Sequence, residues 1–155
     1  MSDNELIQRM MELVLERHKG QVDKLGAPYF FHPVRVSLNV TTTTQKLIAL
    51  GHDLLEDTAT GYNELAALFG LEVACGILIL SKPPGVKYLD FIENIIQYDD
   101  PDVIRVKIAD IEDNMSNERF NRLDVDDQIR LSKKYEPALT ELRYALMMLE
   151  RNGNG

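Results

Sequence analysis

The sequence predicts a single all-α domain, and three observations support this prediction. The chain has 155 residues, a common length for one domain. Apolar residues make up 45% of the chain, and most recur with the period of about 3.6 that helices with one buried face show. Helix-start and helix-stop signals separate these stretches and leave short connections. We therefore expect a compact multi-helix bundle over residues 1–151, followed by a tail at 152–155 that frays.

The first forty residues are expected to form two helices. Ser2 and Glu5 have the spacing of a capping box, which predicts a helix from Ser2 to a stop signal at Gly20. Pro33 suits the first turn of a second helix. The apolar residues of 34–40 alternate, however, and alternation by itself is typical of a strand. We expect a helix here.

The middle of the chain is expected to form three more helices. The first begins with a cap at Thr44 and continues through Asp57. The second covers 62–69 and is ended by Gly70. The third covers 71–80 and is apolar nearly all round, so we expect it to be buried.

The C-terminal half is also expected to be helical. After a break of two prolines and a glycine, the apolar spacing predicts a helix over 88–96. Asp100 and Pro101 are the residue types of a cap and a first helical position, and they begin another helix. A long last segment covers 125–151, where Pro137 begins a new helix or kinks the old one.

Composition and charge exclude several classes of protein. The chain has 17 basic and 25 acidic residues and a formal net charge of −8, which argues against a general nucleic-acid binder but allows a small anionic substrate. The single Cys75 excludes an internal disulfide framework and a multi-cysteine zinc site. The acidic N-terminus is unlike a secretory signal, and no apolar run approaches the roughly 20 residues of a membrane span. We therefore expect a cytoplasmic protein that binds neither nucleic acid nor membrane.

Four ionisable residues lie close together in the third expected helix. They are His52, Asp53, Glu56 and Asp57. Spacings of three and four place them on neighbouring ridges of one helix face. A solvated acidic face is the ordinary explanation of such a cluster. The apolar flanks predict a buried helix instead, in which a metal ion would relieve the repulsion, since imidazole and carboxylate together suit manganese, iron or zinc.

Two other segments could complete a metal site. His32 precedes Pro33, and alone it would more often be a structural histidine than a ligand. Asp110 alone would be a surface acid, but Lys107 lies one turn before it and Asn114 one turn after it on the same helix face. Together with the His52-Asp53 pair, these residues would make a site of two histidines and two carboxylates with open positions for water and substrate.

These residues resemble the metal-ligand signature of the HD phosphohydrolase superfamily. An ordered series of further motifs is similar to the hydrolase domains of RelA/SpoT-type alarmone enzymes, over about residues 14–117. The series is His18-Lys19-Gly20-Gln21, Gly26-Ala27-Pro28-Tyr29 with His32-Pro33, His52-Asp53-x-x-Glu56-Asp57-Thr58, Phe69-Gly70-x-x-Val73-Ala74, Leu80-Ser81-Lys82 and Lys107-Ile108-Ala109-Asp110-x-x-x-Asn114. We expect no synthetase domain in so short a chain, which therefore resembles the small, stand-alone hydrolases.

The resemblance implies a metal-dependent hydrolase that removes the 3′-pyrophosphate of ppGpp or pppGpp. It implies one divalent metal ion, manganese in the first place and iron or zinc as alternatives. The positions that match the metal ligands are His32, His52, Asp53 and Asp110. The implied partner is a small anionic nucleotide substrate.

The resemblance also implies roles for four other residues. Glu56 and Asp57 match the pair that orients and deprotonates the attacking water, and a carboxylate one turn from the ligands suits this role. Asn114 matches a residue near the metal and the ribose phosphate, and Lys24 lies in the substrate loop. Lys107 either helps to neutralise phosphate or is a surface lysine that extends into solvent.

Three positions depart from the family pattern. Asp23 stands where an arginine is usual, Leu25 where a serine is usual, and Ile111 where a basic residue is usual. If Asp23 points into the cleft, it favours a changed substrate; if it points into solvent, it favours the guanine alarmone. Two alternatives therefore stay open: an HD phosphohydrolase for another nucleotide or phosphorylated metabolite, such as the 2′-phosphate of NADPH, and a non-catalytic nucleotide-binding module.

Overall fold

The computed structural model describes residues 1–153 and confirms the all-α prediction. Its helices are α1 (Asp3–Arg17), α2 (Phe31–Leu38), α3 (Thr43–Gly51), α4 (Leu54–Asp57), α5 (Tyr62–Phe69), α6 (Leu71–Ile79), α7 (Tyr88–Tyr98), α8 (Pro101–Asn114), α9 (Asn117–Phe120) and α10 (Val125–Gly153). Within the described residues, β-pairing is limited to an isolated antiparallel bridge between Val22 and Pro28, in the loop after α1.

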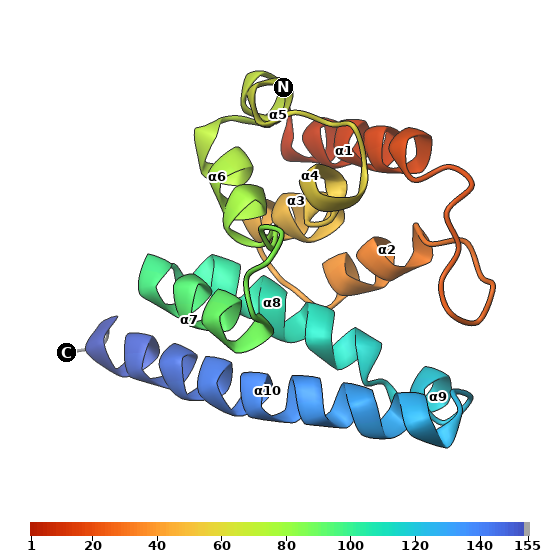
Figure 1. The fold of residues 1–155 in the computed structure, drawn as a ribbon. Coiled ribbons are helices and arrows are strands. Elements are labelled where there is room, and N and C mark those ends of the chain that lie inside the picture. Colours follow the sequence, from red (N-terminus) through yellow and green to blue (C-terminus); the bar gives the residue numbers. More distant parts are fainter. Residues whose placement is uncertain (154–155) are drawn as a thin grey trace.

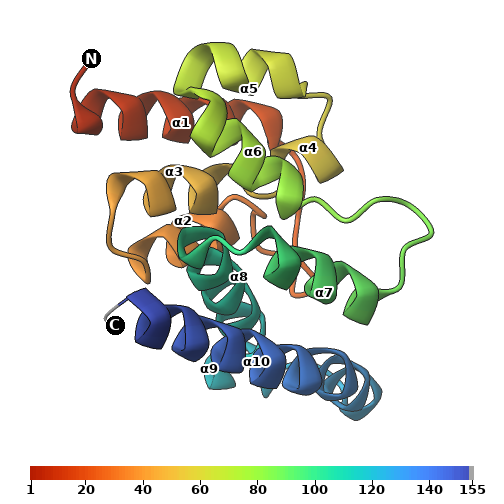
Figure 2. The ribbon, with the colours of Figure 1, turned by 90° about the vertical axis from the view of Figure 1, so that its left-hand side faces the viewer.

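Helix α3 is the centre of the fold and packs against α1, α2, α6 and α8. Helices α1 and α5 lie at one end of the molecule and α10 lies at the other, with α3 and α8 between them (Figure 1, Figure 2). A Cβ atom on Gly51 of α3 would lie 2.7 Å from the Ile77 side chain of α6. One on Gly76 of α6 would lie 2.6 Å from the Ile48 side chain. The two glycines therefore allow the close approach of α3 and α6.

Several local predictions are confirmed. Ser2 and Glu5 form the predicted capping box of α1. The Asp100 side chain accepts from Asp102 N at the start of α8, with Pro101 in the first turn. Residues 31–38 are helical, as expected in spite of the alternating apolar pattern.

The prediction of one helix from Thr44 through Asp57 is wrong at both its start and its middle. Thr42, not Thr44, caps α3 through a capping box with Gln45. The helix ends at Gly51 and α4 begins only at Leu54. His52 Nδ1 lies 2.6 Å from Ala49 O, the carbonyl that Asp53 N–H would use in a continuous helix, so the imidazole competes for it.

Two further differences concern α6 and α9. Leu71 and Leu78 of α6 are 67% and 48% exposed, so this helix is not buried all round as expected. The short α9 was not predicted. Pro137 does not begin a new helix, because α10 is continuous from Val125 to Gly153. Residues 154–155 of the expected tail lie outside the described part. None of the described helices combines the length and apolar character that a bilayer crossing requires.

Candidate functional site

The four predicted metal ligands come together in the interior of the fold. His32 lies in the first turn of α2, His52 and Asp53 form the turn between α3 and α4, and Asp110 lies on α8. Each is buried, with between 2% and 9% of its surface exposed. Because α2, α3 and α8 pack against one another, residues far apart in the sequence meet here. We call these four residues the His/Asp cluster.

Short contacts connect the members of the His/Asp cluster. His32 Nε2 lies 2.9 Å from Asp110 Oδ1. His52 Nε2 lies 3.0 Å from Asp53 Oδ2 and 3.4 Å from Asp110 Oδ1. One ligand atom from each of His32, His52 and Asp53 lies within 4.8 Å of the other two. This cluster could bind a metal ion.

The hydrogen bonds on the far side of each imidazole fit a metal site. His52 Nδ1 faces Ala49 O at 2.6 Å and His32 Nδ1 faces Asp113 Oδ2 at 2.7 Å, so in both rings Nδ1 is the donor when the imidazole is neutral. The two Nε2 lone pairs then face carboxylate oxygens. His52 Nε2 is buried and, although it lies close to Asp53 and Asp110, it forms no well-aligned hydrogen bond among the described residues. A cation between these groups would satisfy all of them at once.

The electrostatics of the cluster favour a positive charge at the same point. Burial lowers the pKa of His52, but the charges of Asp53 and Asp110 outweigh burial and raise this pKa well above its ordinary value. The pKa of His32 is also raised, because hydrogen bonds to Asp110 and Asp113 outweigh burial. The cluster therefore attracts a proton or a metal ion.

Glu56 and Asp57 lie beside the cluster on α4, with exposed side chains. Carboxylate oxygens of Asp53, Glu56 and Asp57 all lie within 4.8 Å of one another. Lys82 N donates to Glu56 Oε1 at 3.2 Å. Partial burial of its carboxyl group and the charges of Asp53 and Asp57 raise the pKa of Glu56 above its ordinary value. A carboxylate with a raised pKa is suited to taking a proton from a neighbouring water.

Residues from two motifs near the N-terminus contact the segment that holds Asp53 and Asp57. The Tyr29 hydroxyl donates to Asp53 Oδ2, so Tyr29 contacts a member of the His/Asp cluster. His18 Nδ1 lies 2.8 Å from Gln21 Oε1, and Gln21 Nε2 donates to the backbone oxygen of Asp57 at 3.0 Å. These contacts link the loop after α1 to α4.

Lys107, Asn114 and Tyr135 surround Asp110 on its other side. Lys107 is buried and its Nζ lies 2.9 Å from Asp110 Oδ2, so the interpretation as a solvent-exposed lysine is wrong. Asn114 Nδ2 lies 3.4 Å from both Asp110 Oδ1 and the Tyr135 hydroxyl. Tyr135 lies on α10. No local signal in the sequence marks it as a site residue.

The loop that holds Lys24 is organised by Asp23. Asp23 Oδ1 accepts from Leu25 N at 2.9 Å and from Ala27 N at 3.0 Å, and Oδ2 accepts from Arg119 Nη2 at 3.2 Å. Only 11% of the Asp23 side chain is exposed. Asp23 therefore neither faces solvent nor presents a free charge, because Arg119 pairs with it. Lys24 is 51% exposed and lies 3.9 Å from an oxygen of Asp127.

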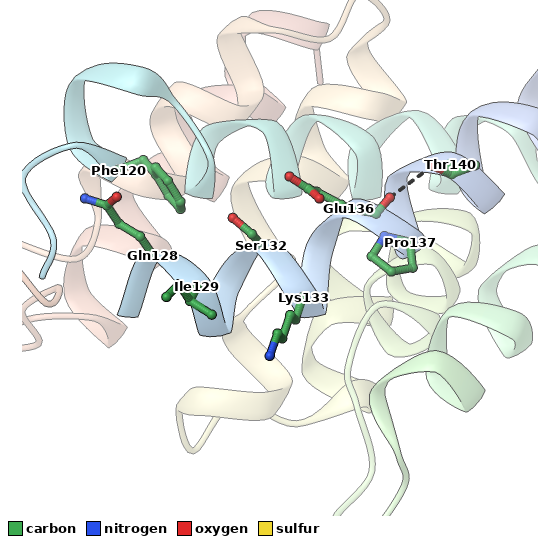
Figure 3. A pocket seen from close by; sticks show the side chains of 8 residues that line it. All are labelled: Phe120, Gln128, Ile129, Ser132, Lys133, Glu136, Pro137 and Thr140. Carbon is green, nitrogen blue, oxygen red and sulfur yellow. Dashed lines mark hydrogen bonds between the residues drawn. The ribbon is translucent and has the colours of Figure 1, made fainter. Parts of the chain in front are cut away.

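A cavity of about 280 Å³ adjoins the His/Asp cluster. It is lined by Val22, Asp23, Lys24, Leu25, Tyr29, His32, Asn114, Arg119, Leu123, Leu131 and Tyr135. A larger groove, of about 760 Å³, runs along the outer face of α10 past Ser132 and Glu136 (Figure 3). No predicted site residue lines this groove. The smaller cavity is the candidate substrate site, since His32 connects it to the cluster.

Comparison with known proteins agrees with the fold and the motifs. The chain is 36% identical over 121 residues to the guanosine-3′,5′-bis(diphosphate) 3′-pyrophosphohydrolase of Aquifex aeolicus, which covers 72% of this chain and 17% of that protein. It is 32% identical over 113 residues to the bifunctional (p)ppGpp synthase/hydrolase SpoT of Escherichia coli, covering 64% of this chain and 16% of SpoT. The chain thus spans less than a fifth of the length of these relatives. No model of a known protein family matches it.

The fold is also that of a solved structure. A metazoan ortholog of SpoT that hydrolyses ppGpp superposes with a TM-score of 0.71 at 20% identity, over 95% of this chain and 94% of that one. The all-α architecture is therefore shared over nearly the whole length. The matched segments agree with the resemblance that the ordered motifs indicated: the chain is similar in sequence to proteins named (p)ppGpp pyrophosphohydrolase or synthase/hydrolase, and it shares the fold of the SpoT ortholog.

Proposed function

We propose that this protein is a metal-dependent phosphohydrolase that removes the 3′-pyrophosphate of ppGpp or pppGpp. The observation that carries the proposal is the buried His/Asp cluster, which adjoins a cavity of about 280 Å³ and has Glu56 and Asp57 beside it. The similarity to the pyrophosphohydrolase of A. aeolicus over 72% of the chain supports this substrate class.

The His/Asp cluster would hold one divalent metal ion, and we take manganese as the first choice. The chemistry of the donors supports a metal, since two imidazole nitrogens and two carboxylates converge and one of the nitrogens, His52 Nε2, forms no well-aligned hydrogen bond among the described residues. A divalent ion supplies Lewis acidity, which lowers the pKa of water and offsets charge on phosphoryl oxygens. Iron and zinc also suit this donor set, so the assay decides among them.

The surrounding residues would activate the water and bind the nucleotide. Glu56 takes the proton of the attacking water, because its exposed carboxylate has a raised pKa and lies next to Asp53. Asp57 orients that water from the same turn of α4. Lys24 and Asn114 line the cavity and contact the nucleotide. Lys107 acts through Asp110, whose second oxygen it neutralises.

The reaction balances without any further reactant. The water oxygen forms a bond to the phosphorus next to the 3′ oxygen, and the bond between that phosphorus and the 3′ oxygen breaks. Glu56 accepts one proton of the water, and the departing 3′ oxygen takes a proton from solvent. The products from ppGpp are GDP and pyrophosphate.

A second candidate function is hydrolysis of a different phosphorylated nucleotide. Leu25 lines the cavity and cannot hydrogen-bond a base edge, and Ile111 is fully buried, so neither supplies the polar contact usual in the family. Asp23 lines the cavity, the position that would favour a changed substrate, but its pairing with Arg119 offsets the charge that would repel a phosphate.

The test is product analysis with the purified, manganese-loaded protein and a panel that includes ppGpp, pppGpp, GTP and NADPH. GDP and pyrophosphate from ppGpp support the first proposal. Turnover confined to another nucleotide supports the second, and no turnover of any member supports a non-catalytic module. Glu56→Gln serves as the control for contamination, since equal activity of variant and wild type would show that the turnover has another source.

A further inference from the structure

We propose that Asp113 and Arg119 are positioning residues that hold the imidazole of His32 and connect it to the cavity loop through Asp23. The inference rests on the proposed function, because it concerns how the same site is held. A continuous series of side-chain contacts runs from Asp23 through Arg119 and Asp113 to His32.

Asp113 lies one turn after Asp110 on α8 and is 8% exposed. Its Oδ2 lies 2.7 Å from His32 Nδ1 and accepts from Arg119 Nη1 at 2.8 Å. Arg35 on α2 donates to the same carboxylate from Nε at 2.8 Å and from Nη2 at 3.1 Å. Helix α8 therefore contacts the His32 ring at both nitrogens, with Asp113 at Nδ1 and Asp110 at Nε2.

This arrangement determines the orientation of the His32 ring and which of its nitrogens faces the rest of the His/Asp cluster. A hydrogen bond from Nδ1 to a carboxylate sets the ring orientation, leaves the Nε2 lone pair free and makes it a better ligand. The charge of Asp113 is compensated by Arg35 and Arg119, and that of Asp23 by Arg119. Asp113 therefore needs no positive charge on His32 to be stable in its buried position.

Arg119 is the branch point of the series. One arm of its guanidinium reaches Asp113 on α8 and the other reaches Asp23, the residue that also binds two backbone amides of the loop. Arg119, Asp23 and His32 all line the cavity. A nucleotide in the cavity thus contacts both ends of the series. A lysine at 119 would keep the charge but could not serve both carboxylates, because a single ammonium group lacks the planar fork.

The test compares four variants by two readouts. Manganese affinity is measured by titration calorimetry on the metal-free protein, and KM and kcat are measured with ppGpp. The variants are Asp113→Asn, Arg119→Lys, Asp23→Asn and Arg143→Lys. Arg143 is the matched control, since it forms a 3.2 Å pair with Glu112 on the exposed face of α8 and α10, away from the cavity. Thermal melting reports folding of each variant.

We expect Asp113→Asn to weaken manganese binding about 10- to 100-fold, the usual effect of losing a group that orients a metal ligand. Asp23→Asn should raise KM, because the loop that lines the cavity loses its charged contact with Arg119, and it should lower manganese affinity less than Asp113→Asn does. Arg119→Lys should change both readouts and Arg143→Lys neither.

Manganese affinity of wild-type strength in Asp113→Asn would overturn the proposal, as would an Arg119→Lys variant that matches Arg143→Lys in both readouts. If Asp113→Asn does not fold, the Arg119→Lys variant tests the proposal instead. That variant is expected to fold, because Arg35 still compensates the buried charge of Asp113. If the wild type does not hydrolyse ppGpp, the proposed function fails, and the manganese affinities still test the positioning role.

Discussion

Replacement of Lys107 by methionine tests how far the site depends on a buried ion pair. Lys107 is 7% exposed, and its Nζ lies 2.9 Å from Asp110 Oδ2. The nitrogen also lies 5.2 Å from the centre of the Phe91 ring. Methionine keeps an unbranched side chain of similar length against this aromatic wall but removes the charge. Lys107→Met therefore leaves Asp110 as a buried carboxylate without its cation.

The magnitude follows from the geometry. At 2.9 Å and an effective dielectric constant of about 20, the attraction is about 6 kcal/mol, which desolvation of both groups opposes. Removing one partner of a buried pair costs about 3–5 kcal/mol in practice. His32 and His52 also contact Asp110 and can take up a proton, so we expect the lower value, about 3 kcal/mol. For a chain of this size the melting temperature should fall by roughly 6–12 °C.

The assay is urea unfolding of wild type and Lys107→Met, in EDTA and again with saturating manganese. The difference between the two proteins should narrow with manganese, because a cation beside Asp110 replaces part of the lost charge. Lys133→Met, on the exposed face of α10, is the matched control and should change stability by less than about 0.5 kcal/mol. If Lys107→Met is as stable as Lys133→Met in EDTA, the argument that Asp110 depends on Lys107 is refuted.

Three other outcomes are expected. Glu56→Gln should lower kcat by about 10²- to 10⁴-fold; in the wild type kcat/KM should fall as the pH is lowered through the raised pKa of Glu56, because only the deprotonated base accepts a proton, and this acidic limb should vanish from the pH profile of the variant. EDTA should reduce hydrolysis to background and lower the melting temperature, and manganese should restore both, since a ligand that binds the folded state stabilises it. Thr42→Ala should destabilise the protein by about 1 kcal/mol in urea unfolding, whereas Thr44→Ala should cost clearly less, because Thr42 is the residue that caps α3.

The features that the sequence predicts well depend on neighbours within one or two turns. The capping box at Ser2 and the start of α8 at Asp100 are local contacts, and their signals lie within four residues. The members of the His/Asp cluster could be selected because each lies in a short motif with a recognisable spacing. The structure then brings these residues together through the packing of α2, α3 and α8.

The features that sequence reasoning missed depend on partners far away in the chain. The role of Asp23 is decided by Arg119, which is 96 residues away, so the sequence could not show that its charge is neutralised. Tyr135 reaches the site only because α10 packs along α8. The break at His52 has a different cause, since there a side chain competes with the backbone for one carbonyl oxygen, and helical periodicity does not report such competition.

The charges of the buried carboxylates support a cation at one particular point. Three carboxylates are buried among the described residues: Asp53, Asp110 and Asp113. Asp110 has Lys107 as its partner, and Asp113 has two arginines. Asp53 pairs with His52 and accepts from the Tyr29 hydroxyl, and within the described chain it forms no ion pair with a lysine or arginine. Its buried charge is therefore offset either by a proton on His52 or by a bound cation. The two imidazole nitrogens converge at this same point, so a divalent ion suits it better than a further lysine would. Such an ion would also make this acidic protein compatible with the phosphorylated substrate that we propose.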